Sequence, residues 1–102
     1  MRVIVLFNLK PGITPAVYEE WSRNRDIPGV RSLPSVDDFR VYRTTGLLGG
    51  NGAAPYAYVE VLDILDVDGF GTDSAGEASQ QVARELFDHA EAPVFIVTEQ
   101  IE

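Results

Sequence analysis

Residues Tyr18–Arg43 read YEEWSRNRDIPGVRSLPSVDDFRVYR, and the fold predicted from the sequence is built around this stretch. Its pattern predicts one helix, a crossing segment interrupted by prolines, and one long strand that carries polar side chains. The stretch contains Trp21, Asp26 and several arginines, although the chain as a whole is strongly acidic. A basic, aromatic and carboxylate-bearing segment in an acidic protein indicates where a binding site should be sought.

Length and charge limit the classes of protein that the chain can belong to. With 102 residues we expect a single domain over residues 1–102. The formal net charge of −8 argues against nucleic-acid binding and against adhesion to anionic membranes, because both need clustered Lys and Arg. The first ten residues show no cleavage pattern and are too short to span a bilayer, so we expect a cytoplasmic protein.

The first half of the chain predicts a strand, a helix and a second strand. Residues 2–10 favour a strand whose two faces are both apolar. Thr14 followed by Pro15 is typical of a helix start, and the helix should end near Asp26 because Ile27 precedes a proline. Residues 35–45 predict the second strand, and the glycine-rich residues 46–55 predict a flexible connection.

The second half predicts two more strands around a broken helix. Residues 56–62 favour the third strand, and Asp66 is expected to cap a helical region that breaks at Gly71 and Gly76. The helix then resumes and ends near His89, Pro93 closes it, and residues 94–101 predict a fourth strand with apolar side chains on both faces.

The resulting order is β-α-β-β-α-β, which is the ferredoxin-like α+β arrangement with a four-stranded antiparallel sheet and both helices on one face. The first and fourth strands are apolar on the other face too. Large apolar patches are seldom left exposed to water, since burying them is favourable by about 25 cal/mol per Å². We therefore expect a homodimer that closes through the two sheet faces.

The segments 18–21, 25–28 and 33–36 resemble a recurring pattern of the dimeric α+β barrel superfamily. In several of its branches the pattern reads aromatic-Trp, then His-x-Pro, then Leu-Pro-Gly-Val. This chain has Asp26 where those branches place histidine, and Ser35 where they place glycine. Histidine-based mechanisms are therefore not transferred to Asp26.

Nearly the whole chain also resembles the narrower RedY-like (HapK) family. The resemblance lies in VIVLFNLKPGIT at residues 3–14, LPSVDDFRVYR at residues 33–43 and PYAYVEVLDI at residues 55–64. Members of that family come from gene clusters that make prodiginine, the red tripyrrole pigments. The resemblance implies a role in the bipyrrole branch of that biosynthesis.

Asp26 is the first candidate catalytic residue. A carboxylate in the last turn of a helix opposes the helix dipole, so its presence there needs a reason. Burial would raise its pKa and make it a usable general acid or base. The alternative interpretation is a salt bridge with Arg23, Arg25 or Arg31.

His89 is the second candidate, because it is the only histidine and the only side chain expected to titrate near neutrality without perturbation. The alternative interpretation is structural, since a histidine in the last turn of a helix interacts favourably with the dipole.

The candidate ligand-binding residues are aromatic or charged side chains on the predicted first helix and the strands. Tyr18, Trp21 and Phe7 would form a flat apolar wall that suits a planar pyrrole, or would simply be core. Arg25 shares the helical stripe of Tyr18 and Trp21. Buried charges need partners, so an internal pair of Arg40 or Arg43 with Glu60 is predicted, with Tyr58 on the same strand as Glu60.

No metal site and no cofactor are expected. The chain has one histidine and no cysteine, which leaves a transition-metal site unsupported. Residues 66–77 match four positions of a calcium-binding loop, but Phe70 stands where an oxygen ligand belongs.

Three functions follow from these residues and the resemblance. The first is a cofactor-free enzyme that cyclises, condenses or isomerises an aromatic or pyrrole-type intermediate. In it Asp26 and His89 would move protons, the aromatic residues would orient the ring, and Arg43 would hold a carboxylate or enolate. The second is a non-catalytic binding protein that shields an intermediate or assists a biosynthetic enzyme. The third is a haem- or oxygen-handling relative of the monooxygenases of the superfamily.

Overall fold

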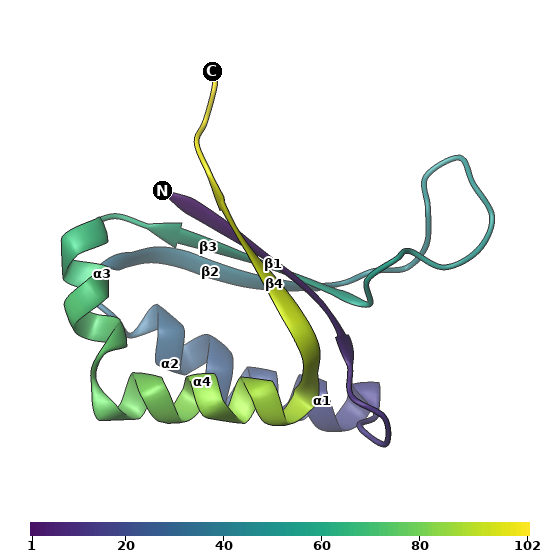
Figure 1. Cartoon of the computed structure of the whole chain (residues 1–102), viewed down its shortest axis with the longest axis horizontal. Helices are drawn as coiled ribbons and strands as arrows, with labels where there is room; N and C mark the ends of the chain where they lie inside the picture. Colours follow the sequence, from purple (N-terminus) through teal and green to yellow (C-terminus); the bar gives the residue numbers. More distant parts are fainter.

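The structure, a computed structural model, describes residues 1–102 and contains one sheet with all its helices on one face (Figure 1). The four strands are antiparallel and lie in the order β2-β3-β1-β4, which confirms the predicted ferredoxin-like α+β arrangement. The elements are β1 (Arg2–Leu9), α1 (Pro15–Trp21), the π-helical segment η1 (Ser22–Asp26), α2 (Ile27–Arg31), β2 (Val36–Arg43), β3 (Tyr58–Ile64), α3 (Val67–Ser74), α4 (Glu77–His89) and β4 (Ala90–Thr98).

The core lies between the sheet and the helices, around three fully buried aromatic side chains. Phe7 of β1 stacks on Tyr58 of β3 with ring centroids 5.6 Å apart, and Tyr18 of α1 meets Phe7 edge-on at 5.3 Å. Such aromatic contacts contribute beyond the area they bury. The remaining buried members of this cluster are Val3, Val5, Ile64, Leu86 and Ala90.

The first helical region differs from the prediction at its end. Thr14 caps it as expected, with its hydroxyl accepting from the Val17 amide, but the helix does not stop near Asp26. It widens into η1, where the Ile27 amide donates to the Ser22 carbonyl five residues back, and then continues through Pro28 to Arg31. A proline in a regular helix clashes with the carbonyl four residues before it. The wider turn just before Pro28 displaces those carbonyls, so the helix continues.

The last strand also starts earlier than predicted. It begins at Ala90, directly after α4, and Pro93 lies inside it rather than before it. β4 is an edge strand, where the missing N–H of a proline is tolerated, and the pairing register with β1 shifts at this point. Ala92 takes up the irregularity with a φ of 41°.

On the face of the sheet away from the helices, β1, β3 and β4 carry apolar side chains, as predicted for both β1 and β4. No helix covers it (Figure 1). Val94 and Ile96 of β4 are each 40% exposed. They stand opposite Leu6 and Ile4 of β1 in the pairing register. Val59 and Val61 of β3 continue this open face on the other side of β1.

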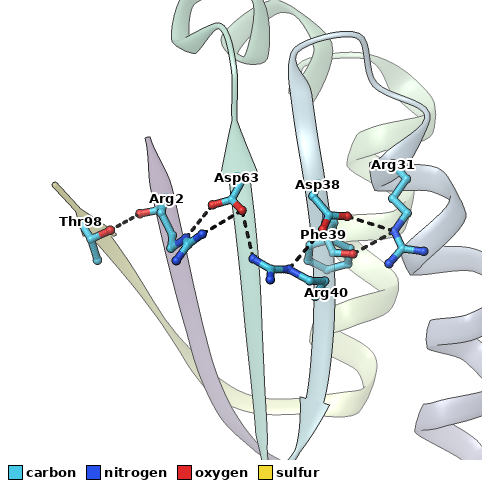
Figure 2. Close-up of polar contacts among 7 residues, drawn as sticks. All are labelled: Arg2, Arg31, Asp38, Phe39, Arg40, Asp63 and Thr98. Atoms are coloured by element: carbon cyan, nitrogen blue, oxygen red, sulfur yellow. Dashed lines mark hydrogen bonds and ion pairs between the residues drawn. The ribbon is translucent and has the colours of Figure 1, made fainter. Parts of the chain in front are cut away.

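One end of the open face carries a ladder of charged side chains that crosses the sheet (Figure 2). Arg2 binds Asp63 through two hydrogen bonds of 2.6 and 3.1 Å. Arg40 lies within 3.1 Å of Asp63 and 3.2 Å of Asp38. Arg31 reaches round from α2 to the Phe39 carbonyl at 2.9 Å and to Asp38 at 3.6 Å. Each charge in the ladder therefore has an opposite charge beside it.

The connection between β2 and β3 extends away from the body of the molecule (Figure 1). Leu48 on this connection is fully exposed. None of the helices combines the length and apolar character needed to cross a bilayer.

The central position of Phe7 predicts a large loss of stability when its ring is removed. Phe7→Ala should lower the free energy of unfolding by about 3–5 kcal/mol, because it deletes the ring on which Tyr18 and Tyr58 pack. Urea unfolding followed by far-UV circular dichroism measures this. Leu48→Ala is the control and should change little, and a Phe7→Ala variant as stable as wild type would contradict the assignment of this core.

Candidate functional site

A cavity of about 530 Å³ lies between the helix face of the sheet and the helices η1, α2, α3 and α4. Its volume falls in the range of small-molecule sites, and most of its lining is apolar. The apolar lining includes Val3, Val5, Val30, Leu33, Phe39, Leu62, Phe70, Val82, Leu86 and Phe95. A larger hollow of about 860 Å³ lies beside the two chain ends, but polar residues dominate its walls. The smaller, apolar cavity is therefore the better candidate.

Asp26 lines this cavity and is 4% exposed. It is the last residue of η1, so the widened turn determines where its side chain lies. No arginine, hydroxyl or amide of the chain donates a hydrogen bond to its buried Oδ2 atom. The alternative interpretation, a salt bridge to a nearby arginine, is wrong, because Arg23, Arg25 and Arg31 pair instead with Glu19, Glu85 and Asp38 respectively.

Glu60 of β3 also lines the cavity and is 3% exposed. The Tyr18 hydroxyl donates to its Oε2 atom at 3.2 Å. The predicted pair of Glu60 with Arg40 or Arg43 is wrong. Arg40 points to the open face, where it joins the charged ladder, and Arg43 binds Glu19 through two bonds of 2.8 and 2.7 Å.

The two buried carboxyls influence each other. Burial is the main cause that raises the pKa of Asp26 to about 7, while a hydrogen bond with Glu60 acts in the opposite direction. Burial and the charge of Asp26 together raise the pKa of Glu60 well above its usual range. Two carboxyls in one apolar site do not both ionise easily, so near neutrality the pair holds at least one proton. A group that titrates near the working pH is suited to proton transfer.

Arg25 lines the cavity but is already neutralised. Its Nε and Nη2 atoms donate to both oxygens of Glu85 at 3.0 and 2.8 Å, and the Trp21 indole N–H donates to the same carboxylate at 2.8 Å. These donors lower the pKa of Glu85 to about 2. The arginine is therefore not a free cation for a ligand.

His89 lies outside the cavity lining, at the end of α4. Its Nδ1 is 2.7 Å from the Glu85 carbonyl oxygen, which only accepts, so Nδ1 carries the hydrogen. Its ring stacks on Trp21 with centroids 4.8 Å apart and an angle of 21°. The structure thus brings His89 and Trp21 together, but not onto the same surface as Asp26.

The other predicted ligand-binding residues do not line the cavity either. Phe7, Tyr18 and Tyr58 fill the core beside it, as described above. The Tyr58 hydroxyl and Arg43 both donate to Glu19, whose pKa this lowers to about 2. Arg43 and Tyr58 also line a separate hollow of about 140 Å³. Of the predicted site residues, Arg25, Asp26 and Glu60 share the cavity.

The sequence analysis missed most of the apolar lining and the contact between Asp26 and Glu60. The sequence did indicate that Glu60 is buried, because it stands between Tyr58 and Leu62 on the face of β3 that the helices cover. A carboxyl at a buried position needs a partner or a proton. No group of three or more histidine, aspartate or glutamate side chains is arranged to hold a metal ion.

The buried carboxyl pair predicts an unusual dependence of stability on pH. Because the folded pKa of Asp26 lies above its unfolded value, the folded state holds more protons between about pH 4 and 7, and stability falls as pH rises through this window. The loss should be roughly 1–4 kcal/mol between pH 5 and 8. Asp26→Asn should reduce this loss, since an amide does not ionise.

Urea unfolding of both proteins at pH 5 and pH 8 measures the effect. Asp88→Asn removes an exposed carboxyl from α4 and serves as the matched control. Equal stability of the wild type at the two pH values would contradict the raised pKa of Asp26.

Three solved structures show what the chain is similar to. HapK from Hahella chejuensis has 29% identity, covers 99% of this chain and 93% of its own, and superposes with a TM-score of 0.72. A dimeric ferredoxin-like protein of unknown function from Thermobifida fusca has 21% identity, a TM-score of 0.67, and coverages of 93% and 85%. SnoaB from Streptomyces nogalater, a cofactor-independent oxygenase, has 16% identity, a TM-score of 0.70, and coverages of 97% and 92%.

Sequence comparison gives the family. No curated protein sequence matches the chain. The model of the family described as REDY-like protein HapK matches residues 1–101, in agreement with the resemblance noted in the sequence. The chain therefore belongs to the REDY-like HapK family.

Proposed function

We propose that this protein binds a planar aromatic intermediate in the cavity and moves protons on it with Asp26 and Glu60, in the bipyrrole branch of a prodiginine-type pathway. The observation that carries the proposal is the pair of buried carboxyls on an otherwise mostly apolar cavity wall. Membership of the HapK family supports a small biosynthetic or accessory protein. The assignment to a prodiginine-type pathway rests on the family resemblance described in the sequence analysis.

The shape and chemistry of the cavity suit a flat, mostly apolar ligand. Apolar side chains from the sheet and from α2, α3 and α4 line it. A ligand buried there would leave water and gain most of its affinity from this apolar surface. The two carboxyls would then act in a low-dielectric environment, where each charge interacts more strongly with the ligand than in water.

The carboxyl pair supplies an acid and a base for a cyclisation or condensation without a cofactor. In its ionised form Asp26 accepts a proton from the ligand. The protonated carboxyl of the pair, held by burial and by its neighbour, returns one proton to the atom that becomes negative. Proton transfer of this kind contributes about 10²- to 10⁴-fold to a rate.

A non-catalytic binding protein is the alternative function, and one observation favours it. His89, the second predicted proton-transfer residue, is not among the residues that line the cavity. A buried carboxyl pair can also serve binding alone, by accepting a hydrogen bond from the ligand.

We also propose that two copies associate through the open face of the sheet. Its apolar side chains on β1, β3 and β4 have no cover within the chain, and the charged ladder at one end is already paired internally. A second copy that covers this face would bury apolar surface without leaving unpaired charges. The related ferredoxin-like protein from Thermobifida fusca is described as dimeric.

Substitution of the carboxyls separates the enzyme from the carrier. If the protein is an enzyme, Asp26→Asn and Glu60→Gln should lower turnover of bipyrrole-type pathway intermediates by about 10²- to 10⁴-fold while ligand binding is retained. Liquid chromatography of the products measures turnover, and Asp88→Asn is the control. His89→Ala, assayed alongside, tests whether the histidine takes part. Unchanged turnover in the Asp26 and Glu60 variants would refute their catalytic role, and binding without any turnover in the wild type would favour the carrier.

The oligomeric state tests the association of two copies. Sedimentation velocity at micromolar concentration should give a particle of twice the 11.2 kDa protomer mass. Val61→Lys places a charge on the open face and should give the single protomer, because an unpaired charge in an apolar interface is costly. Val17→Lys, on the exposed side of α1, should remain paired. A wild-type protein that sediments as one protomer would refute the proposal.

A further inference from the structure

The carboxyl pair on the cavity wall has more acceptor oxygens than this chain supplies donors. Asp26 and Glu60 share a hydrogen bond and the Tyr18 hydroxyl donates to Glu60, but no other group of the chain donates to Asp26, which is 4% exposed. A buried acceptor without a partner costs about 1–3 kcal/mol, and more when it is charged. Acceptor oxygens left over on the wall of a ligand-sized cavity indicate that a donor arrives with the ligand.

Most of the other polar side chains around the cavity cannot supply that donor. Arg25 and Gln81 both donate to Glu85. Ser32 and Ser74 donate to the carbonyls of Gly29 and Gly71 respectively. The cavity therefore offers a ligand two carboxyls at one place and no free cation.

From this arrangement we infer the chemistry of the ligand, on the basis of the function proposed above: it is an uncharged planar molecule that carries an N–H or O–H donor, directed at Asp26. A ligand with its own carboxylate is rejected. It would bring a second or third acid group beside Asp26 and Glu60, and no basic side chain in the cavity is available to balance it. This differs from the role predicted for Arg43, which binds Glu19 and does not line the cavity.

Three small aromatic molecules of nearly the same shape test the inference. Indole carries an N–H, benzofuran has an oxygen at the same position, and indole-2-carboxylate adds the anion. Isothermal titration calorimetry at pH 8 should show indole binding about tenfold more tightly than benzofuran, because only indole donates to Asp26. Indole-2-carboxylate should bind at least about tenfold more weakly than indole. Methyl chemical shifts of Leu33 and Val82 confirm that binding is in the cavity.

Substitution of Asp26 tests whether its carboxyl group is the acceptor for the ligand's N–H. Asp26→Leu replaces the carboxylate with an apolar side chain of similar size and should bind indole and benzofuran equally, with the affinity for benzofuran retained. Asp88→Leu, which removes an exposed carboxyl from α4, should keep the tenfold preference of the wild type.

A second measurement needs no variant. The titratable groups that face Asp26 are Glu60 on β3 and Tyr18 on α1, and Arg25, which lines the same cavity, is paired with Glu85 on α4. Ionised carboxylates accept stronger hydrogen bonds than protonated ones. The preference for indole over benzofuran should therefore increase between pH 5 and pH 8, as Asp26 loses its proton.

The possible results separate this inference from the function on which it rests. Equal binding of indole and benzofuran to the wild type, or tighter binding of indole-2-carboxylate than of indole, would overturn the inference while leaving an aromatic-binding cavity. If none of the three molecules shifts the cavity methyls, the cavity is not an aromatic site. The proposed function would then fail together with this inference.

Discussion

One layer of helices packs on a sheet that is apolar on both faces, and the other features of this protein depend on that constraint. On the helix face, Phe7, Tyr18 and Tyr58 bring the two layers into close contact at one place. Beside this cluster the helices and the sheet leave a cavity of about 530 Å³. The open face, in contrast, has a charged ladder at one end (Figure 2) and, beside it, uncovered apolar side chains of β1, β3 and β4. The same two-faced strands thus account for the candidate site and for the surface proposed to meet a second copy.

The distribution of charge explains why the carboxyl pair keeps its unusual properties. Most of the arginines pair with carboxylates while their own side chains stay at least half-exposed, so the guanidinium groups keep much of their contact with water and the ion pair needs little desolvation of the cation. Bringing an arginine into the cavity would require removing its charge from water, which costs several kcal/mol before any pairing. Asp26 and Glu60 therefore share the cavity with no cation between them. Their raised pKa values follow from burial and from each other, as expected for two acids in one apolar site.

The π-helical segment Ser22–Asp26 is the local structure that makes this pairing possible. It lets the helix pass through Pro28 and places Asp26 inside the fold rather than at a frayed helix end. Wider turns of this kind are uncommon and are often found at functional sites. The departure from regular helix geometry therefore includes Arg25 and Asp26, two of the residues that line the candidate site.

The sequence alone determined the order of the elements, the capped helix start at Thr14 and the two apolar faces of β1 and β4, because these depend on neighbours within a few residues. It also singled out Asp26 as a carboxylate that needed an explanation. It could not determine the partner of Asp26, since Glu60 lies 34 positions later and meets it only when β3 packs beneath the helices. Nor could it show that His89 and Trp21 stack outside the cavity, or that Arg43 is held by Glu19. Such contacts depend on the tertiary structure, because packing selects, among many possible partners for each charge, the one that the folded chain brings within reach.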